Sequence, residues 1–253
     1  MENLSFFDCN CVVGRRGRMY PGSFFSREDL VTAMAHYGIG KALVYHSLAR
    51  EYNPRVGNSA ILEDTGKEPS LYPAWVVLPH HTGEFPEPEQ LVERMKSANV
   101  RSVRMFPAEM EQQVSLAEWN CGALLSAMEA HRVPLMLPLD QMDWNSLHDM
   151  LCHHPGLNVV LTDVDYRVDR NLYALFEKFA HLSIETIGYK VHRGIEEICR
   201  RFGAERLVFG SGMPLYSGGA AVSMINYARL SVREKQMIAH GNLERLLGGV
   251  VYG

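Results

Sequence analysis

The chain has 253 residues, of which 47% are hydrophobic and 21% are charged, a balance typical of globular proteins and not of disordered chains. Its formal net charge of −4 and its pI near 6.3 argue against nucleic acid or an anionic membrane as the partner. The length fits one α/β barrel, which needs about 250 residues.

The sequence indicates a cytoplasmic protein with reduced thiols. No apolar run approaches the roughly 20 residues that a membrane-spanning helix needs, and the N-terminus has no basic region or cleavage pattern. Five cysteines cannot all pair, and their apolar surroundings favour unpaired core thiols. They are Cys9, Cys11, Cys121, Cys152 and Cys199.

Short apolar segments alternate with helical segments along the whole chain. Continuous apolar runs of this length are typical of strands that are covered on both faces. We predict strands at 6–13, 41–45, 74–78, 102–106, 134–137, 158–161, 182–186 and 206–209. We predict helices at 27–37, 88–98, 116–131, 144–153, 170–180 and 191–202, a weaker helix at 53–66, and extra C-terminal helices at about 217–248.

Crossovers long enough for a helix imply parallel strands, and eight such units predict an α/β protein, a single (β/α)8 TIM barrel over residues 1–253. A doubly wound sheet is the alternative. The G-x-G-x-x-G pattern that would favour dinucleotide binding is absent after the first strand.

Polar side chains gather where the predicted strands end, which is the face at which barrels place their sites. A carboxylate at such a position loses hydration unless it meets a cation, a metal or water. His46 can equally be a simple loop cap, and Arg104 can be either an anion clamp or part of a buried ion pair. The set comprises Asn10, His46, His80, His81, Arg104, Asp140, Asp163, Asp165, Glu185 and Ser211.

Three segments carry a family resemblance. The C-terminal part reads FGAERLVFGSGMP at 202–214 and IAHGNLERLL at 238–247, and the first strand reads FDCNCVVG at 7–14. This pattern resembles the amidohydrolase-2 branch of the metal-dependent hydrolases. The resemblance spans essentially the whole chain and implies the same barrel fold.

The resemblance also implies a metal centre, and the sequence departs from it there. Members of that branch hold divalent ions with two histidines on strand one, histidines after strands five and six, and an aspartate after strand eight. The corresponding positions here are Asn10, Val12, Pro138, Asp163 and Gly212. Three of these side chains cannot ligate a metal, whereas a catalytic zinc needs about three protein ligands. We therefore expect no metal ligands from the family set and no cofactor.

Three interpretations of function remain open. The first is a metal-independent hydrolase of a small carboxylated lactone, ester or amide, with catalytic roles for His46, His80, Asp163 and Glu185. The second is a non-catalytic barrel that binds a small anionic ligand or a protein partner. The third is a hydrolase with a relocated divalent metal site built from the same histidines and carboxylates.

The expected partner of the site is a small anionic molecule. Arg104, helped by Arg15 or Arg16, would bind its carboxylate or a developing oxyanion. Asn10, Asp140 and Ser211 complete the predicted binding set. Partly apolar helix surfaces make a homodimer possible, although the sequence assigns none.

Overall fold

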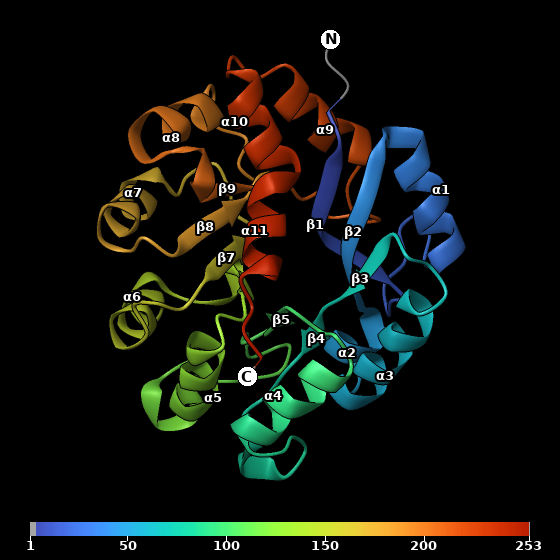
Figure 1. Cartoon of the computed structure of the whole chain (residues 1–253), viewed down its shortest axis with the longest axis vertical. Coiled ribbons are helices and arrows are strands. Elements are labelled where there is room, and N and C mark those ends of the chain that lie inside the picture. The colour runs from blue at the N-terminus through green and yellow to red at the C-terminus, as the bar shows by residue number, and fades with distance from the viewer. Residues whose placement is uncertain (1–3, 253) are drawn as a thin grey trace.

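Parallel strands form the centre of the molecule in the computed structural model, which describes residues 4–252 (Figure 1). The ends of the predicted domain, at 1–3 and 253, lie outside the described residues. Each strand pairs in parallel with the next one in the chain within two sheets, β1-β2-β3 and β4 to β9. The strands are β1 (Phe6–Val13), β2 (Ile39–His46), β3 (Leu71–Pro73), β4 (Trp75–Val76), β5 (Val103–Arg104), β6 (Leu135–Pro138), β7 (Val159–Thr162), β8 (Leu182–Glu185) and β9 (Leu207–Val208).

The two sheets join into one ring. Only Ala74 separates β3 from β4, and its N–H donates to the Val44 carbonyl at 2.8 Å. At the other junction the Cys9 N–H donates to the Phe209 carbonyl at 2.9 Å, so the end of the last strand meets β1. This closure confirms the predicted (β/α)8 barrel and excludes the open doubly wound sheet.

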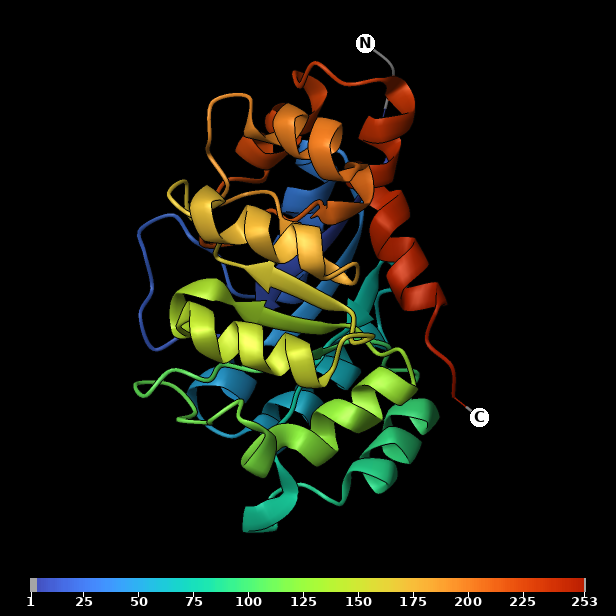
Figure 2. The same ribbon diagram turned by 90° about the vertical axis from the view of Figure 1, so that its left-hand side faces the viewer.

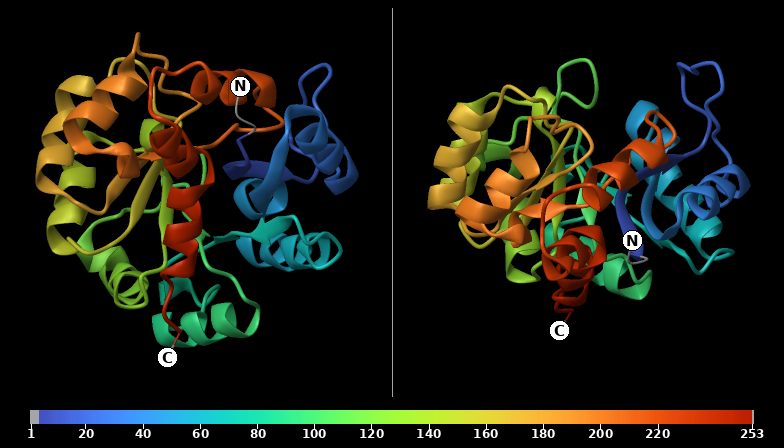
Figure 3. Two further views of the ribbon diagram at one scale, coloured as in Figure 1. Left: turned by 45° about the horizontal axis from the view of Figure 1, so that its top comes forward. Right: turned by 90° about the horizontal axis from the view of Figure 1, so that it is seen from above.

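Helices surround the ring, with α5 to α8 on one side and α1 to α3 on the other (Figure 3). Their ends follow local signals, since Ser26 caps the first helix and Ser231 forms a capping box with Glu234. The short helix after β2 was not predicted. The helices are α1 (Arg27–Tyr37), α2 (Ser47–Glu51), α3 (Pro54–Thr65), α4 (Pro88–Ser97), α5 (Glu118–Ala130), α6 (Trp144–His153), α7 (Asp169–Lys178), α8 (Gly194–Phe202), α9 (Gly218–Asn226), α10 (Val232–Gln236) and α11 (Asn242–Gly248).

Alternation of side chains along the strands divides the core into two layers. Phe7, Leu43 and Met136 belong to a cluster inside the ring. Phe6, Val44 and Leu135 belong to a second cluster, which packs between the strands and the helices. Burial on both faces explains why the strands read as continuous apolar runs. None of the described helices combines the length and hydropathy needed to cross a bilayer.

One end of the barrel is covered by α11. Leu243, Leu246 and Leu247 pack in the same cluster as Phe7, close to the start of β1. The Asn242 amide donates to the backbone carbonyls of Ala204 and Leu207, at the start of β9, each at 2.8 Å. Figure 2 shows α11 in red on one side of the molecule and the blue loop after β1 on the other. The opposite end, where the strands terminate, is the mouth of the barrel.

Candidate functional site at the barrel mouth

Asn10 and Glu185 meet inside the mouth. Asn10 Nδ2 donates to Glu185 Oε1 at 3.0 Å and to Oε2 at 2.9 Å. The pairing register of β1 shifts between Asp8 and Cys11, and Asn10 lies within this irregular stretch. Such bulges are common beside active sites because they redirect a side chain. The β1 bulge and the end of β8 thus bring the two predicted residues together.

Burial dominates the electrostatics of Glu185, which is 1% exposed. Desolvation, followed by the negative charge of Asp163, raises the pKa of Glu185 to about 8, although the Asn10 hydrogen bonds act in the opposite direction. The carboxyl group is therefore largely protonated at neutral pH. Its position also depends on Gly210, because a Cβ there would lie 2.3 Å from Glu185 Oε1.

A second buried carboxylate lies beneath this pair. Asp8 Oδ1 accepts the backbone N–H of Asn10 at 2.9 Å and that of Ser211 at 3.0 Å, which ties β1 to the loop after β9. Asp8 Oδ2 is buried without a hydrogen-bond partner. Desolvation raises the pKa of Asp8. Ser211 is itself fully buried, with its hydroxyl 3.8 Å from Cys11 Sγ and accepting the Met213 N–H at 3.1 Å.

Arg104 lies across the interior of the ring and is 2% exposed. Its Nη2 donates to the Cys9 carbonyl at 2.6 Å, and its guanidinium carbon lies 4.9 Å from the centre of the Tyr45 ring. Its Nε–H is buried without a partner. The positive charge of Arg104 opposes the rise in the pKa of Glu185, which places both groups in one electrostatic environment.

Asp163 and Asp140 lie at the outer part of the mouth. Asp163 follows β7 directly, is exposed, and has a φ of 52°, a left-handed conformation that is uncommon outside glycine. Residues held in such conformations cluster at functional sites. Desolvation and then the charge of Asp163 raise the pKa of Asp140. Burial raises the pKa of Tyr216, and the negative charges of Asp163, Glu185 and Asp140 raise it further. The Tyr216 side chain therefore lies near these three carboxyl groups.

His46 is placed at the start of α2. Its Nδ1 accepts the Leu48 N–H at 3.1 Å, which makes it the N-cap of that helix. Its ring fills the space beside Gly14, where a Cβ would come within 2.3 Å of Cε1. Desolvation lowers its pKa, so the ring is neutral near pH 7. The capping role is the alternative that the sequence left open, and a catalytic role stays a prediction.

His80 and Arg15 have contacts other than the Asn10–Glu185 pair. His80 Nε2 lies 3.3 Å from Glu87 Oε2, and its ring is 4.3 Å from that of His81. Arg15 is exposed in the loop after β1, and its carbonyl accepts the Ser47 hydroxyl at 2.8 Å. The roles predicted for these residues therefore stay predictions.

Several mouth residues were not predicted. Arg50 forms a two-pronged ion pair with Glu111 and stacks 4.7 Å from the centre of the Phe106 ring. Tyr216 follows the last strand in a loop, and Lys190 lies 5.7 Å from its ring centre. Arg50 lies in a helix that was not predicted. For Tyr216, the glycines that follow it in the loop after the last strand were the sequence signal for a residue at the mouth.

Within residues 4–252 no three His, Cys, Asp or Glu side chains are grouped so that they could hold a metal ion. Pro138 and Gly212 occupy two of the positions at which the resembled branch carries ligands. Gly212 has a φ of 64°, and a Cβ there would meet the Tyr216 ring at 2.6 Å.

Comparisons with known proteins agree with this barrel. A family model described as Amidohydrolase matches residues 16–249. No curated protein matches the chain. Among solved structures, an uncharacterized TIM-barrel protein from Bordetella bronchiseptica is 17% identical, with a TM-score of 0.76 over 97% of this chain and 99% of that one.

Two other similar structures have described ligands. A dihydroxybenzoic acid decarboxylase from Polaromonas sp., with bound manganese and the inhibitor 2-nitroresorcinol, is 13% identical, with a TM-score of 0.71 and 97% of each chain covered. A probable 2-pyrone-4,6-dicarboxylic acid hydrolase from Acinetobacter baumannii, with citric acid bound, is 16% identical, with a TM-score of 0.68 over 96% of this chain and 99% of that one.

These findings correct one prediction and confirm another. The expectation of no cofactor is wrong, because the Polaromonas enzyme of the same fold is described with bound manganese. The resemblance seen in the first strand and the C-terminal segments is confirmed by the family model over nearly the whole chain. The chain belongs to the amidohydrolase family.

Proposed function

We propose that the protein is an enzyme that acts on a small carboxylated molecule at the barrel mouth, by hydrolysis of a lactone, ester or amide. The observation that carries this proposal is Glu185, a buried carboxyl group with a pKa raised to about 8 and held by Asn10. A group poised near the working pH is what general acid–base chemistry requires.

In the proposed reaction Glu185 supplies a proton. Its neutral form donates to the leaving oxygen or nitrogen as the bond to the acyl carbon breaks, and its carboxylate is then reprotonated from water. Asn10 holds the carboxyl group through both of its oxygens and so limits its rotation. Asp163, exposed at the rim, is proposed to orient the attacking water.

Arg104 is proposed as the anchor for the substrate's negative charge. It forms no ion pair within the described chain, and its Nε–H lacks an acceptor. A buried donor without a partner costs free energy, so an anionic ligand that reaches it gains more than it would at a solvated arginine. The Acinetobacter protein, described as acting on a pyrone dicarboxylic acid, supports a carboxylated lactone as the substrate class.

The manganese of the Polaromonas decarboxylase supports a divalent metal for this family member as well. The described residues do not fit such an ion as they stand. Glu185 is engaged by the Asn10 amide, and no group of three ligand side chains is present within residues 4–252. The proton-transfer role of Glu185 therefore depends on the side chains around it, Asn10 and Asp163.

Decarboxylation is the second candidate. The Polaromonas enzyme is described as a decarboxylase, and loss of CO2 leaves a carbon that must be protonated. A neutral buried Glu185 is suited to that step also. The two reactions differ in product, since hydrolysis adds water to the substrate and decarboxylation releases CO2.

The test is turnover of a panel of carboxylated lactones, esters and hydroxybenzoates, with products identified by mass spectrometry and each assay run with added Mn²⁺ and with chelator. We expect Glu185→Gln to lower kcat by about 10²–10⁴-fold, the usual contribution of a general acid. The exposed Glu63→Gln is the matched control and should act like the wild type. Turnover that Glu185→Gln leaves unchanged would refute the assignment.

A further inference from the structure

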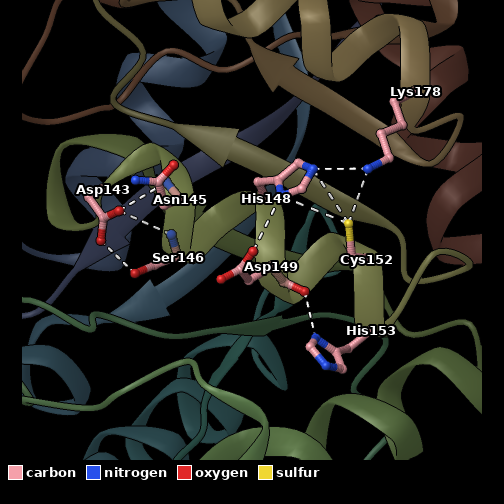
Figure 4. A network of polar contacts seen from close by, with 8 residues as sticks. All are labelled: Asp143, Asn145, Ser146, His148, Asp149, Cys152, His153 and Lys178. Carbon is pink, nitrogen blue, oxygen red and sulfur yellow. Dashed lines mark hydrogen bonds and ion pairs between the residues drawn. The ribbon is translucent and has the colours of Figure 1, made fainter.

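A cluster of three reactive side chains lies on the outer helices, apart from the mouth (Figure 4). Lys178 Nζ lies 3.3 Å from Cys152 Sγ and 2.9 Å from His148 Nε2, and His148 Nε2 lies 3.5 Å from Cys152 Sγ. His148 and Cys152 are four residues apart on α6, which puts them on one face of that helix. Lys178 is the last residue of α7.

The geometry sets the protonation pattern of the cluster. A lysine ammonium has only donors, so the contact with Lys178 makes His148 Nε2 an acceptor and leaves the ring proton on Nδ1. That nitrogen lies 3.3 Å from Asp149 Oδ1, which accepts the proton. The Nε2 lone pair therefore faces Cys152 Sγ and the ammonium together. A base oriented by a carboxylate and directed at a thiol is the arrangement that activates a nucleophile.

The cluster is held in place by Phe179. The His148 ring packs edge-on against the Phe179 ring at 5.8 Å, and Lys178 Nζ lies 5.1 Å from the same ring centre. Phe179 is itself 5% exposed and belongs to the core. Lys178 and His148 therefore both pack against Phe179 beside the thiol, although all three members of the cluster are at the surface.

Cys152 is also the cysteine that reagents can reach. The other four cysteines are buried, and Cys152 is exposed. Burial raises the pKa of Cys9, Cys11, Cys121 and Cys199, which further suppresses their reactivity.

We propose that Cys152 is a modification site for small hydroperoxides. His148 takes the thiol proton, and the sulfur attacks one peroxide oxygen as the O–O bond breaks. Sulfur gives up two electrons, and the leaving oxygen takes the proton, so that a thiol and a hydroperoxide yield a sulfenic acid and water or an alcohol. Lys178 stabilises the thiolate before the attack. Neither step uses the groups at the mouth.

The test is reaction of the full chain with hydrogen peroxide at pH 7, with the sulfenic acid trapped by a dimedone reagent and located by mass spectrometry. We expect one adduct, at Cys152, and none in Cys152→Ser. Lys178→Gln and His148→Asn should each slow formation of the adduct by about tenfold. Lys67→Gln, an exposed lysine elsewhere on the surface, is the matched control and should react at the wild-type rate.

The proposal fails if Cys152 reacts no faster than free cysteine, or if Lys178→Gln and His148→Asn, folded as judged by circular dichroism, both react like the wild type. An adduct on one of the four buried cysteines in preference to Cys152 would also overturn it. Because the test measures a surface thiol, its result is independent of turnover at the mouth.

Discussion

Asn10 binds both carboxylate oxygens of Glu185 with one amide nitrogen, across 175 residues of sequence. In the resembled branch the position of Asn10 carries a metal-binding histidine. An amide there fixes a carboxyl group instead, and burial keeps that group protonated at neutral pH. The centre of the mouth thus holds a hydrogen-bonded amide–carboxyl pair at this position.

Replacing Asn10 by alanine should raise the pKa of Glu185 further. The amide hydrogen bonds favour the charged carboxylate, so their loss leaves desolvation less opposed. The alkaline limb of the pH–activity profile should move above its wild-type position near pH 8. Asn171→Ala, on the exposed part of α7, is the control. A limb that does not move in Asn10→Ala would contradict the assignment of that limb to Glu185.

The contribution of Glu185 to the stability of the fold should fall as the pH rises from 4.5 to about 8, the interval between the ordinary and the raised pKa of Glu185. In that interval the folded state keeps a proton that the unfolded state has lost, so the free energy of unfolding decreases with pH. At one pKa unit per 1.36 kcal/mol the upper limit is on the order of 5 kcal/mol.

Glu185→Gln removes this titration and should flatten the profile between those pH values, as measured by urea unfolding at several pH values. Glu63→Gln should keep the wild-type slope. Equal slopes in wild type and Glu185→Gln would show that the carboxyl group is not protonated in the folded state.

Most of the fold could be predicted because its signals are local. Apolar runs marked every strand region except β3 (71–73), which precedes the strand predicted at 74–78, and Ser26 and Gly38 set the ends of the first helix at the observed residues. The interruption at Ala74 was missed, since a break in strand pairing depends on neighbours that are distant in sequence. The short α2 was missed because its cap is the side chain of His46, a residue type that rarely signals a helix start.

The site was harder to predict, since its chemistry depends on which strand ends converge. The sequence predicted the position of Glu185 in a strand. Its contact with Asn10, and the place of Asp8 next to this pair, depend on the bulge in β1. Arg50 lies in the short α2 and its partner Glu111 in the loop after β5, and no sequence periodicity connects the two. The expectation of no cofactor rested on three positions without ligand side chains, and such gaps in a family's ligand set do not predict what a family member binds.

Gly210→Ala should disable the site with little effect on the rest of the barrel. The added Cβ would lie 2.3 Å from Glu185 Oε1 and within 2.7 Å of the carboxyl carbon, so the side chain must leave Asn10. We expect activity to fall by at least tenfold, and the pH dependence of stability to change with it. Gly248→Ala, at the end of α11, is the control because its Cβ would meet nothing within 4 Å. Full activity in Gly210→Ala would show that the Asn10–Glu185 contact is dispensable.

Arg104 provides a test in which stability and ligand binding move in opposite directions. Its guanidinium is buried without an ion pair in the described chain, and it keeps one hydrogen bond, to Cys9. A buried charge without an ion-pair partner costs free energy, and an apolar side chain of similar length removes that cost. Arg104→Met should therefore melt within a few degrees of the wild type, or above it, in the absence of ligand.

The same variant should lose the thermal stabilisation that small di- and tricarboxylates, such as citrate, give to the wild type. Arg50→Met is the contrasting variant, because it leaves Glu111 without its partner and should lower the melting temperature. If Arg104→Met keeps the citrate response, Arg104 does not bind the anion. If it unfolds the protein at neutral pH, the arginine is a structural residue whose single carbonyl contact and stacking on Tyr45 outweigh the cost of its burial.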